Sequence, residues 1–206
     1  EAGLMDFGDE QRATELIGEI RQGTSLGRVL GNGAVITGQV LGIRRVPAVK
    51  GQAISAYDPR TIKGIGVTYA TSPQGADHTS GNVIRVEIDH LSPKGQVEVS
   101  RNAQIAMAGY DTLGACLFSG FGFASAPGAL RDMINGRYGW DVGDDVLAEL
   151  GRETLMLERE FNRAASFGPA DDRLPEWVEL TQRHRGLVVT AEPGAGKTTR
   201  LPIALL

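Results

Sequence analysis

"DDVLAELGRETLMLEREFNR" (Asp144–Arg163) gives the strongest indication of helix in this chain. Apolar and small side chains recur in it at intervals of three and four residues, the period of an amphipathic helix. These side chains belong to Val146, Leu147, Leu150, Thr154, Leu157 and Phe161. At 1.5 Å per residue the helix is roughly 30 Å long. The charged residues between them are predicted to form a solvated face and not a binding patch. They are Glu149, Arg152, Glu153, Glu158, Arg159 and Glu160.

Other segments carry weaker helix signals. One helix is predicted from Asp9, a suitable N-cap, to about Gln22, where Gly23 ends it. Further helices are predicted at 25–41 with an interruption at "GNG", at 61–71, at 100–118 as one helix or a broken pair, and at 128–135. The stretch 83–88 alternates well enough for a short strand, with a helix as the alternative, and 72–81 and 119–128 are expected as loops. The predicted fold class is mainly α, in irregular, glycine-rich helical domains.

Glycine is unusually frequent, with 28 of 206 residues, about twice the usual ~7 %. Scattered glycines indicate helix ends and turns, or places where backbones pack closely. We expect the first reading for most of them.

The length and charge of the chain narrow the classes of function that it can have. A chain of 206 residues has room for one domain with a core, or for parts of two. Lysine and arginine number 21 against 25 acidic residues, which indicates no general affinity for nucleic acid in residues 1–178. No apolar run is long enough to cross a membrane, and the start is acidic without a signal pattern, so a cytoplasmic protein is expected.

Two residues are candidates for chemistry. Cys116 is the only cysteine, so no internal disulfide can form. It is either a buried, inert side chain or one thiolate of a metal cluster, with Asp111 accepting hydrogen bonds from a cofactor. His78 lies in a loop of small residues, which suits proton transfer, although most surface histidines have no function. The three histidines and one cysteine lack zinc-ligand spacing.

The last residues have a different character. "AEPGAGKTTRLPIALL" (Ala191–Leu206) fits the spacing of a phosphate-binding loop, with Ala191 for the first glycine, and follows an apolar run at 186–190 that is predicted as a strand. Gly194 and Gly196 would let backbone N–H groups surround a phosphate, Lys197 would reach the outer phosphates, and Thr198 would hold magnesium. We therefore expect three parts: 1–178, a polar junction at 179–185, and a truncated strand, loop and helix at 186–206.

Three stretches carry a resemblance to a known family. They are "VKGQAISAYDPRTIKGIGVTYATSPQGADH" (49–78), "DTLGACLF" (111–118) and "LGRETLMLEREFN" with "DDRLPEW" (150–177). Together they resemble the C-terminal part of the aldehyde ferredoxin oxidoreductases over about residues 1–178. The resemblance implies a tungsten or molybdenum enzyme that oxidises aldehydes to carboxylates. In it, two pterin dithiolenes would hold the metal, and a [4Fe-4S] cluster would pass electrons to ferredoxin.

The resemblance also implies roles for individual residues. Asp111, Ala115, Cys116 and Leu117 match the motif D-x-x-G-L-C-x, with alanine where leucine is usual. The aspartate and the backbone after it would bind a pterin, and Cys116 would be the fourth ligand of the cluster. His78 matches a histidine beside the metal that would accept or donate a proton. "PQGADH" differs from the usual family pattern, which leaves the substrate class open.

The family's other three cluster cysteines and its N-terminal cofactor domain have no counterpart in these residues. We therefore expect this chain to contribute one wall of an active site and to oxidise no aldehyde by itself. Expected partners are ferredoxin, the aldehyde, the missing N-terminal domain and a second copy in a homodimer.

Residues 186–206 resemble the start of a DEAH-type ATP-dependent helicase. An alternative function is accordingly a nucleotide-binding fragment that uses ATP and magnesium. An acidic strand after Leu206 would favour it, and an upstream C-x-x-C-x-x-x-C run would favour the oxidoreductase.

Overall fold

The computed structural model describes residues 2–126 and 128–178, and they confirm the mainly helical fold class. The helices are α1 (Glu10–Gln22), α2 (Ser25–Gly31), α3 (Gly33–Leu41), α4 (Lys63–Thr71), α5 (Gln96–Thr112), α6 (Gly120–Ala124), α7 (Ala129–Tyr138) and α8 (Val146–Ala164), with short 3₁₀ helices η1 (His78–Ser80) and η2 (Leu117–Ser119). Strands β1 (Ala48–Val49) and β2 (Gln52–Ala53) form an antiparallel pair in which Ala48 faces Ala53.

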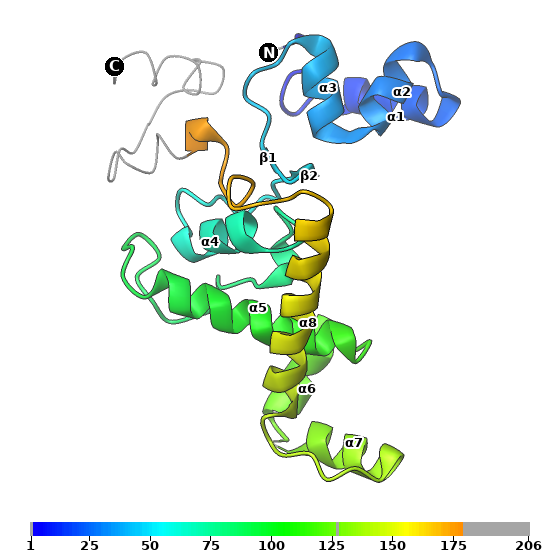
Figure 1. Cartoon of the computed structure of the whole chain (residues 1–206). Helices are drawn as coiled ribbons and strands as arrows, with labels where there is room; N and C mark the ends of the chain where they lie inside the picture. The colour runs from blue at the N-terminus through cyan, green and yellow to red at the C-terminus, as the bar shows by residue number, and fades with distance from the viewer. Residues whose placement is uncertain (1, 127, 179–206) are drawn as a thin grey trace.

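The helices form an elongated molecule (Figure 1). Helices α1, α2 and α3 lie at one end, α4, α5 and α8 form the middle, and α6 and α7 lie at the opposite end. The hairpin of β1 and β2 joins the first group to the middle. No described helix is both long and apolar enough to cross a membrane.

The main core lies around α4. Ile65 and Tyr69 of this helix are fully buried. They pack with the hairpin, with the segment between α4 and α5, and with the segment that follows α8. The buried members of this core are Val49, Ile65, Tyr69, Ala76, Val83, Leu174 and Val178. The core thus fixes the segment 72–81, which carries His78, against the middle of the molecule.

The contact between α4 and α5 is polar. The Thr68 hydroxyl lies 2.8 Å from the Ser100 hydroxyl and donates to the carbonyl oxygen of Gly81 at 2.9 Å. Gln104 donates to the hydroxyls of Ser100 at 3.1 Å and Thr71 at 3.0 Å. These polar groups satisfy one another beside the apolar contacts that Val99 and Ala103 of α5 make with the core.

Helices α5 and α8 cross with backbone almost touching backbone. A Cβ atom built on Gly151 would lie 1.9 Å from the carbonyl oxygen of Ile105, and one on Gly109 would lie 2.3 Å from the carbonyl oxygen of Leu147. One turn further along, the hydroxyls of Thr112 and Thr154 are 2.7 Å apart. Glycine at both positions is therefore what allows the two helices to approach.

Replacing Gly151 with alanine is expected to lower the free energy of unfolding by about 2–3 kcal/mol, because overpacking forces the helices apart. Gly136→Ala in α7 is the matched control, since nothing lies within 4 Å of a Cβ atom there. That variant should gain roughly 0.5–1 kcal/mol from the better helix propensity of alanine. Urea unfolding measures both, and equal stability of the two variants would contradict the close crossing.

A cluster of charged side chains links the C-terminal half of α8 to α4. The Lys50 ammonium, 5 % exposed, lies 2.7 Å from an Asp172 oxygen and donates to the carbonyl oxygens of Ala70 at 2.7 Å and Ser72 at 3.1 Å. Arg159 donates to the other Asp172 oxygen at 2.6 Å and to the carbonyl oxygen of Thr71 at 2.7 Å. Both cations thus lie at the C-terminal end of α4, where helix carbonyls favour positive charge.

Most predicted helices are confirmed. The side chain of Asp9 accepts the N–H of Arg12 as an N-cap, and Gly23 ends α1 in a left-handed conformation. The segment 25–41 divides into α2 and α3 at the predicted "GNG" interruption. The predictions at 61–71, 128–135 and 144–163 correspond to α4, α7 and α8, and 100–118 is the broken pair of α5 and η2.

The strand predicted at 83–88 is wrong. Turns replace it, because side chains capture the backbone: Asn82 accepts the N–H of Ile84, and Asp89 accepts that of Leu91. Within the stretch 83–88, Val83 is fully buried, whereas Ile84 and Val86 are exposed. In the segment 119–128, predicted as a loop, residues 120–124 form α6 instead.

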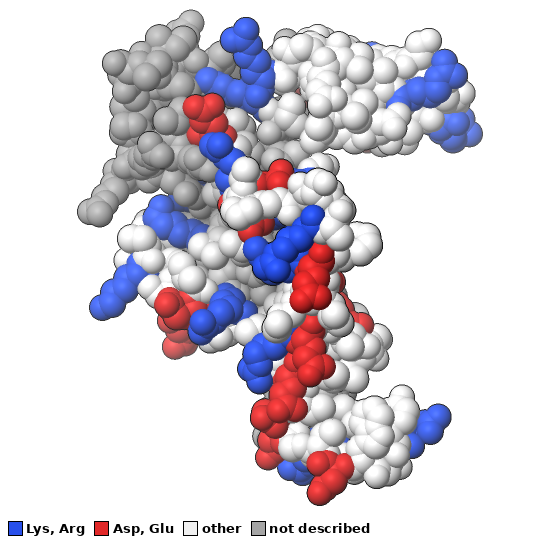
Figure 2. All heavy atoms as spheres, viewed as in Figure 1, with Lys and Arg blue, Asp and Glu red and all other residues white. Residues whose placement is uncertain are grey.

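The faces of α8 also differ from the prediction. Leu157 is 65 % and Phe161 73 % exposed, because the helix meets α5 through its Gly151 side. Glu149, Glu153 and Glu160 are solvated as expected, and acidic side chains run along α8 in Figure 2. Glu158, however, is partly buried, and Arg159, although exposed, also hydrogen-bonds to Asp172 and to the carbonyl oxygen of Thr71.

Candidate functional site

His78 begins η1 and is surrounded by residues of a distant segment. Its Nδ1 lies 3.2 Å from the hydroxyl of Ser55, and its ring stacks on that of Tyr57 with centroids 5.4 Å apart and planes inclined by 24°. The side chain is 43 % exposed. The histidine is therefore held from one side and open on the other, which a group that exchanges protons requires.

Asp77 shapes the backbone next to His78. Its carboxylate accepts the N–H of Thr79 at 2.8 Å and the hydroxyl of Thr79 at 2.9 Å, which caps η1. One of its oxygens lies 3.7 Å from Nδ1 of His78. That separation is too long for a hydrogen bond.

The predicted cofactor-binding loop follows α5. Asp111 belongs to the last turn of the helix, and the chain then reverses at Gly114, which is left-handed with φ 66°. The N–H of Ala115 donates to the carbonyl oxygen of Tyr110 at 2.9 Å, and the Cys116 carbonyl accepts the N–H of Ser119 at 2.8 Å. Cys116 is a free, exposed thiol. The prediction that this cysteine is buried is therefore wrong.

Three carboxylates influence one another between the two candidate segments. Partial burial, followed by the charge of Asp77, raises the pKa of Asp111. Burial, followed by the charge of Asp111, raises the pKa of Glu158 on α8. Neither Asp111 nor Glu158 forms an ion pair with a described lysine or arginine. The structure thus brings the Asp77–His78 segment close enough to Asp111 for their charges to interact.

The donor set fits part of an iron–sulfur site. Cys116 offers an accessible sulfur, and Leu117, which begins η2, is partly exposed beside it. In the described ranges, no group of three or more His, Cys, Asp or Glu side chains is arranged to hold a metal ion. A cubane needs four thiolates, so Cys116 fits as one ligand of a cluster whose remaining ligands come from elsewhere.

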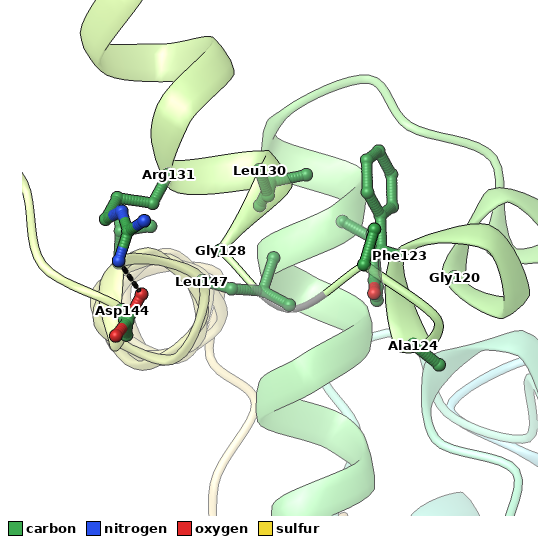
Figure 3. Close-up of a pocket in the computed structure, with 11 residues that line it drawn as sticks. Gly120, Phe123, Ala124, Gly128, Leu130, Arg131, Asp144 and Leu147 are labelled. Atoms are coloured by element: carbon green, nitrogen blue, oxygen red, sulfur yellow. Dashed lines mark hydrogen bonds and ion pairs between the residues drawn. The ribbon is translucent and has the colours of Figure 1, made fainter.

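A pocket at the α6–α7 end of the molecule contains none of the predicted site residues (Figure 3). It has a volume of about 210 Å³ between α5, α6, α7 and α8, with Phe123, Leu130 and Leu147 among its walls. Arg131 at one end is paired with Asp144 and, at 2.7 Å, with Asp132. Its charge is therefore already neutralised, and the pocket suits an apolar group better than an anion.

Sequence reasoning missed the neighbours of His78. Ser55 and Tyr57 contact it, but they lie 23 and 21 residues earlier with no spacing rule that would connect them. The one available signal is that both fall in the stretch 49–78, the first of those that carry the family resemblance. The nucleotide-binding residues predicted at 194–198 lie outside the described residues.

Comparison with known families matches residues 1–199 to the family described as "Aldehyde ferredoxin oxidoreductase, domains 2 & 3". The chain is similar to tungsten-containing aldehyde ferredoxin oxidoreductases of three archaea. Identity is 29 % to that of Pyrococcus horikoshii, with 82 % of this chain and 29 % of the relative covered. It is 33 % for Pyrococcus furiosus, with 74 % and 26 % covered, and 33 % for Thermococcus kodakarensis, with 63 % and 22 % covered.

The chain spans less than a third of the length of these curated relatives. The family match also runs through residue 199, across most of the segment compared above with a helicase, and these comparisons give that resemblance no support.

Proposed function

The chain belongs to the aldehyde ferredoxin oxidoreductase family, and from this membership we propose that it forms one wall of the active site of a tungsten enzyme that oxidises aldehydes to carboxylates. Electrons would leave through a [4Fe-4S] cluster to ferredoxin. The relatives named above carry tungsten and ferredoxin in their descriptions, which supports tungsten over molybdenum. The remaining cluster ligands and cofactor contacts would come from segments that this chain does not contain.

The single observation that carries the proposal is the exposed thiol of Cys116 at the end of the Asp111 loop. Iron–sulfur clusters are held by thiolates, and a ligand supplied to a shared cluster has to be accessible. A cysteine kept for packing would be buried. The geometry therefore favours the ligand role that family membership implies.

Asp111 would bind the pterin through its carboxylate. The group is exposed, and no described lysine or arginine pairs with it, so its acceptor oxygens are available to N–H donors of a ligand. Its raised pKa reflects partial burial and the nearby Asp77 carboxylate. A bound pterin N–H would relieve that repulsion.

His78 would hold a proton during turnover. When bound, the tungsten pterin supplies the two-electron chemistry, and conversion of an aldehyde and water to a carboxylate releases protons. The open side of His78 faces away from Ser55 and Tyr57, which hold the ring. A positioned imidazole can both accept and donate a proton, which suits this transfer.

Removal of the Cys116 thiol tests the proposal. In the holoenzyme, Cys116→Ser should lose the cluster iron and its paramagnetic signal in the reduced state, and ferredoxin reduction by aldehyde should become undetectable. Met133→Ser on α7 is the control, because it also removes an exposed sulfur side chain. Full iron content in Cys116→Ser would refute the assignment. The chain of 206 residues alone should bind no cubane and oxidise no aldehyde.

A further inference from the structure

Two exposed phenylalanines follow Cys116 closely in the chain. Phe118 belongs to η2 and Phe121 to α6, and the two residues are 74 % and 56 % exposed. Their rings contact each other, with centroids 6.3 Å apart and planes inclined by 32°. Leu117, 38 % exposed, lies between Cys116 and this pair in the sequence. Single apolar side chains on a surface are ordinary, whereas a contiguous apolar surface marks a site of interaction.

A cation from a distant segment lies against the same rings. The guanidinium carbon of Arg85 is 5.4 Å from the centre of the Phe121 ring, a distance typical of a cation–π contact. Arg85 forms no ion pair with an aspartate or glutamate of the described residues. Its charge is therefore available to a carboxylate that approaches the rings.

We propose that Arg85, Leu117, Phe118 and Phe121 form an aromatic patch that binds the polypeptide segment with the other three thiolates of the cluster. This inference rests on the proposed function, in which Cys116 is one ligand of a shared [4Fe-4S] cluster. The chain has a single cysteine and a cubane needs four thiolates, so a second segment has to approach Cys116. The aromatic patch begins at the residue after Cys116 and thus borders the place where that segment has to lie.

The residues of the aromatic patch indicate the chemistry of the segment that covers it. Permanent interfaces are large and apolar, whereas the interfaces of transient electron-transfer complexes are small. Exposed phenylalanines suit a permanent contact, because aromatic anchors contribute most where water is excluded from them. The segment should therefore present apolar side chains to Phe118 and Phe121 and one carboxylate to Arg85. Ferredoxin, which would leave after each electron transfer, is the alternative occupant.

Oxidative footprinting of the holoenzyme measures whether the aromatic patch is covered. Hydroxyl radicals oxidise accessible phenylalanine rings, and mass spectrometry reports the extent of oxidation at each ring. Phe118 and Phe121 should react far less in the holoenzyme than in the chain of 206 residues, whether or not ferredoxin is present. Equal reactivity in both proteins would overturn the inference, and so would protection that appears only when ferredoxin is added.

Substitutions test whether the aromatic patch holds the two segments together. In the holoenzyme, Phe118→Ser and Phe121→Ser should each speed the loss of iron to a chelator by at least about tenfold, the effect of truncating an anchor residue of an interface. Arg85→Gln should also speed this loss, because the carboxylate opposite it is then left without its partner. In the chain of 206 residues alone, all three should leave the denaturant midpoint nearly unchanged, since the side chains are exposed there.

Phe161→Ser on α8 is the matched control. Phe161 is 73 % exposed, as Phe118 is, but lies far from Cys116 in the chain. Its substitution should not change the rate of iron loss. A rate that stays normal in both Phe118→Ser and Phe121→Ser would contradict the inference, and a normal rate in Arg85→Gln would contradict the carboxylate assigned to the segment.

Neither readout measures aldehyde oxidation, so the two proposals can fail separately. Full iron content in Cys116→Ser contradicts the proposed function. Loss of iron from Cys116→Ser, combined with unprotected rings and normal iron retention in the phenylalanine variants, contradicts this inference alone.

Discussion

Replacing Lys50 with methionine is expected to lower the free energy of unfolding by about 3–5 kcal/mol, the cost of removing one partner of a buried ion pair. The ammonium has Asp172 and the carbonyl oxygens of Ala70 and Ser72 as partners, and methionine can serve none of them. Methionine keeps the apolar stem of the side chain, so the variant tests the charge. Denaturant unfolding at pH 7 measures the loss.

The effect should depend on pH in a defined direction. Burial raises the pKa of Asp172, but the hydrogen bonds from Lys50 and Arg159 outweigh it and lower the folded-state pKa below the usual value. The unfolded state therefore binds a proton first as pH falls, and the contribution of this pair is complete above about pH 4. The difference between the Lys50→Met and unaltered proteins should shrink below that pH.

Lys94→Met is the matched control for Lys50→Met. Lys94 is exposed between two turns, and its removal should change stability by no more than about 0.5 kcal/mol. The ion pair would not be the main contact that holds the hairpin, α4 and the segment after α8 together if Lys50→Met lowered the free energy of unfolding by less than about 1 kcal/mol. A decrease in stability that grows on acidification would contradict it as well.

Replacing His78 with glutamine in the holoenzyme is expected to lower kcat by about 10²–10⁴-fold, the usual contribution of a positioned acid or base. Glutamine retains hydrogen bonding without a titratable nitrogen. Tungsten and iron content should remain normal, because the proposed role of His78 is proton transfer and not ligation of a metal. Steady-state rates of aldehyde oxidation at several pH values measure the effect.

His90→Gln distinguishes this role from a general loss of histidine. The His90 carbonyl accepts the N–H of Lys63 at the start of α4, at the opposite end of that helix from the segment that carries His78. Its variant should keep kcat within a factor of about 3, consistent with a small structural effect of less than 1 kcal/mol. An unchanged kcat in His78→Gln would exclude the proton-transfer role.

Local signals predicted the helices and their ends well. Asp9 and Gly23 mark α1 because an N-cap and a left-handed glycine act within a few residues, and the period of three and four identified α8. The same reasoning failed at 83–88, where Asn82 and Asp89 redirect the backbone through their side chains. An alternating pattern alone does not reveal that competition.

Tertiary contacts between polar residues could not be predicted from periodicity. Ser100 and Gln104 are buried on α5, where Thr68 and Thr71 of α4 are their hydrogen-bond partners, 32 and 33 residues away in the sequence. The site shows the same limit. His78 and Cys116 were identified as candidates from the sequence, whereas the contact between the Ser55 hydroxyl and Nδ1 of His78 exists only in the folded chain.

The glycine crossing of α5 and α8 has a mechanical consequence. Interfaces of interlocking side chains absorb small displacements by rotamer changes, but main chain in contact with main chain has no such freedom. We therefore expect a displacement of α8 to move α5 with it at Gly109, two residues before Asp111. The two helices would then move as one rigid unit, which Arg159 of α8 ties to Asp172 and to which the loop with Cys116 is joined at the end of α5.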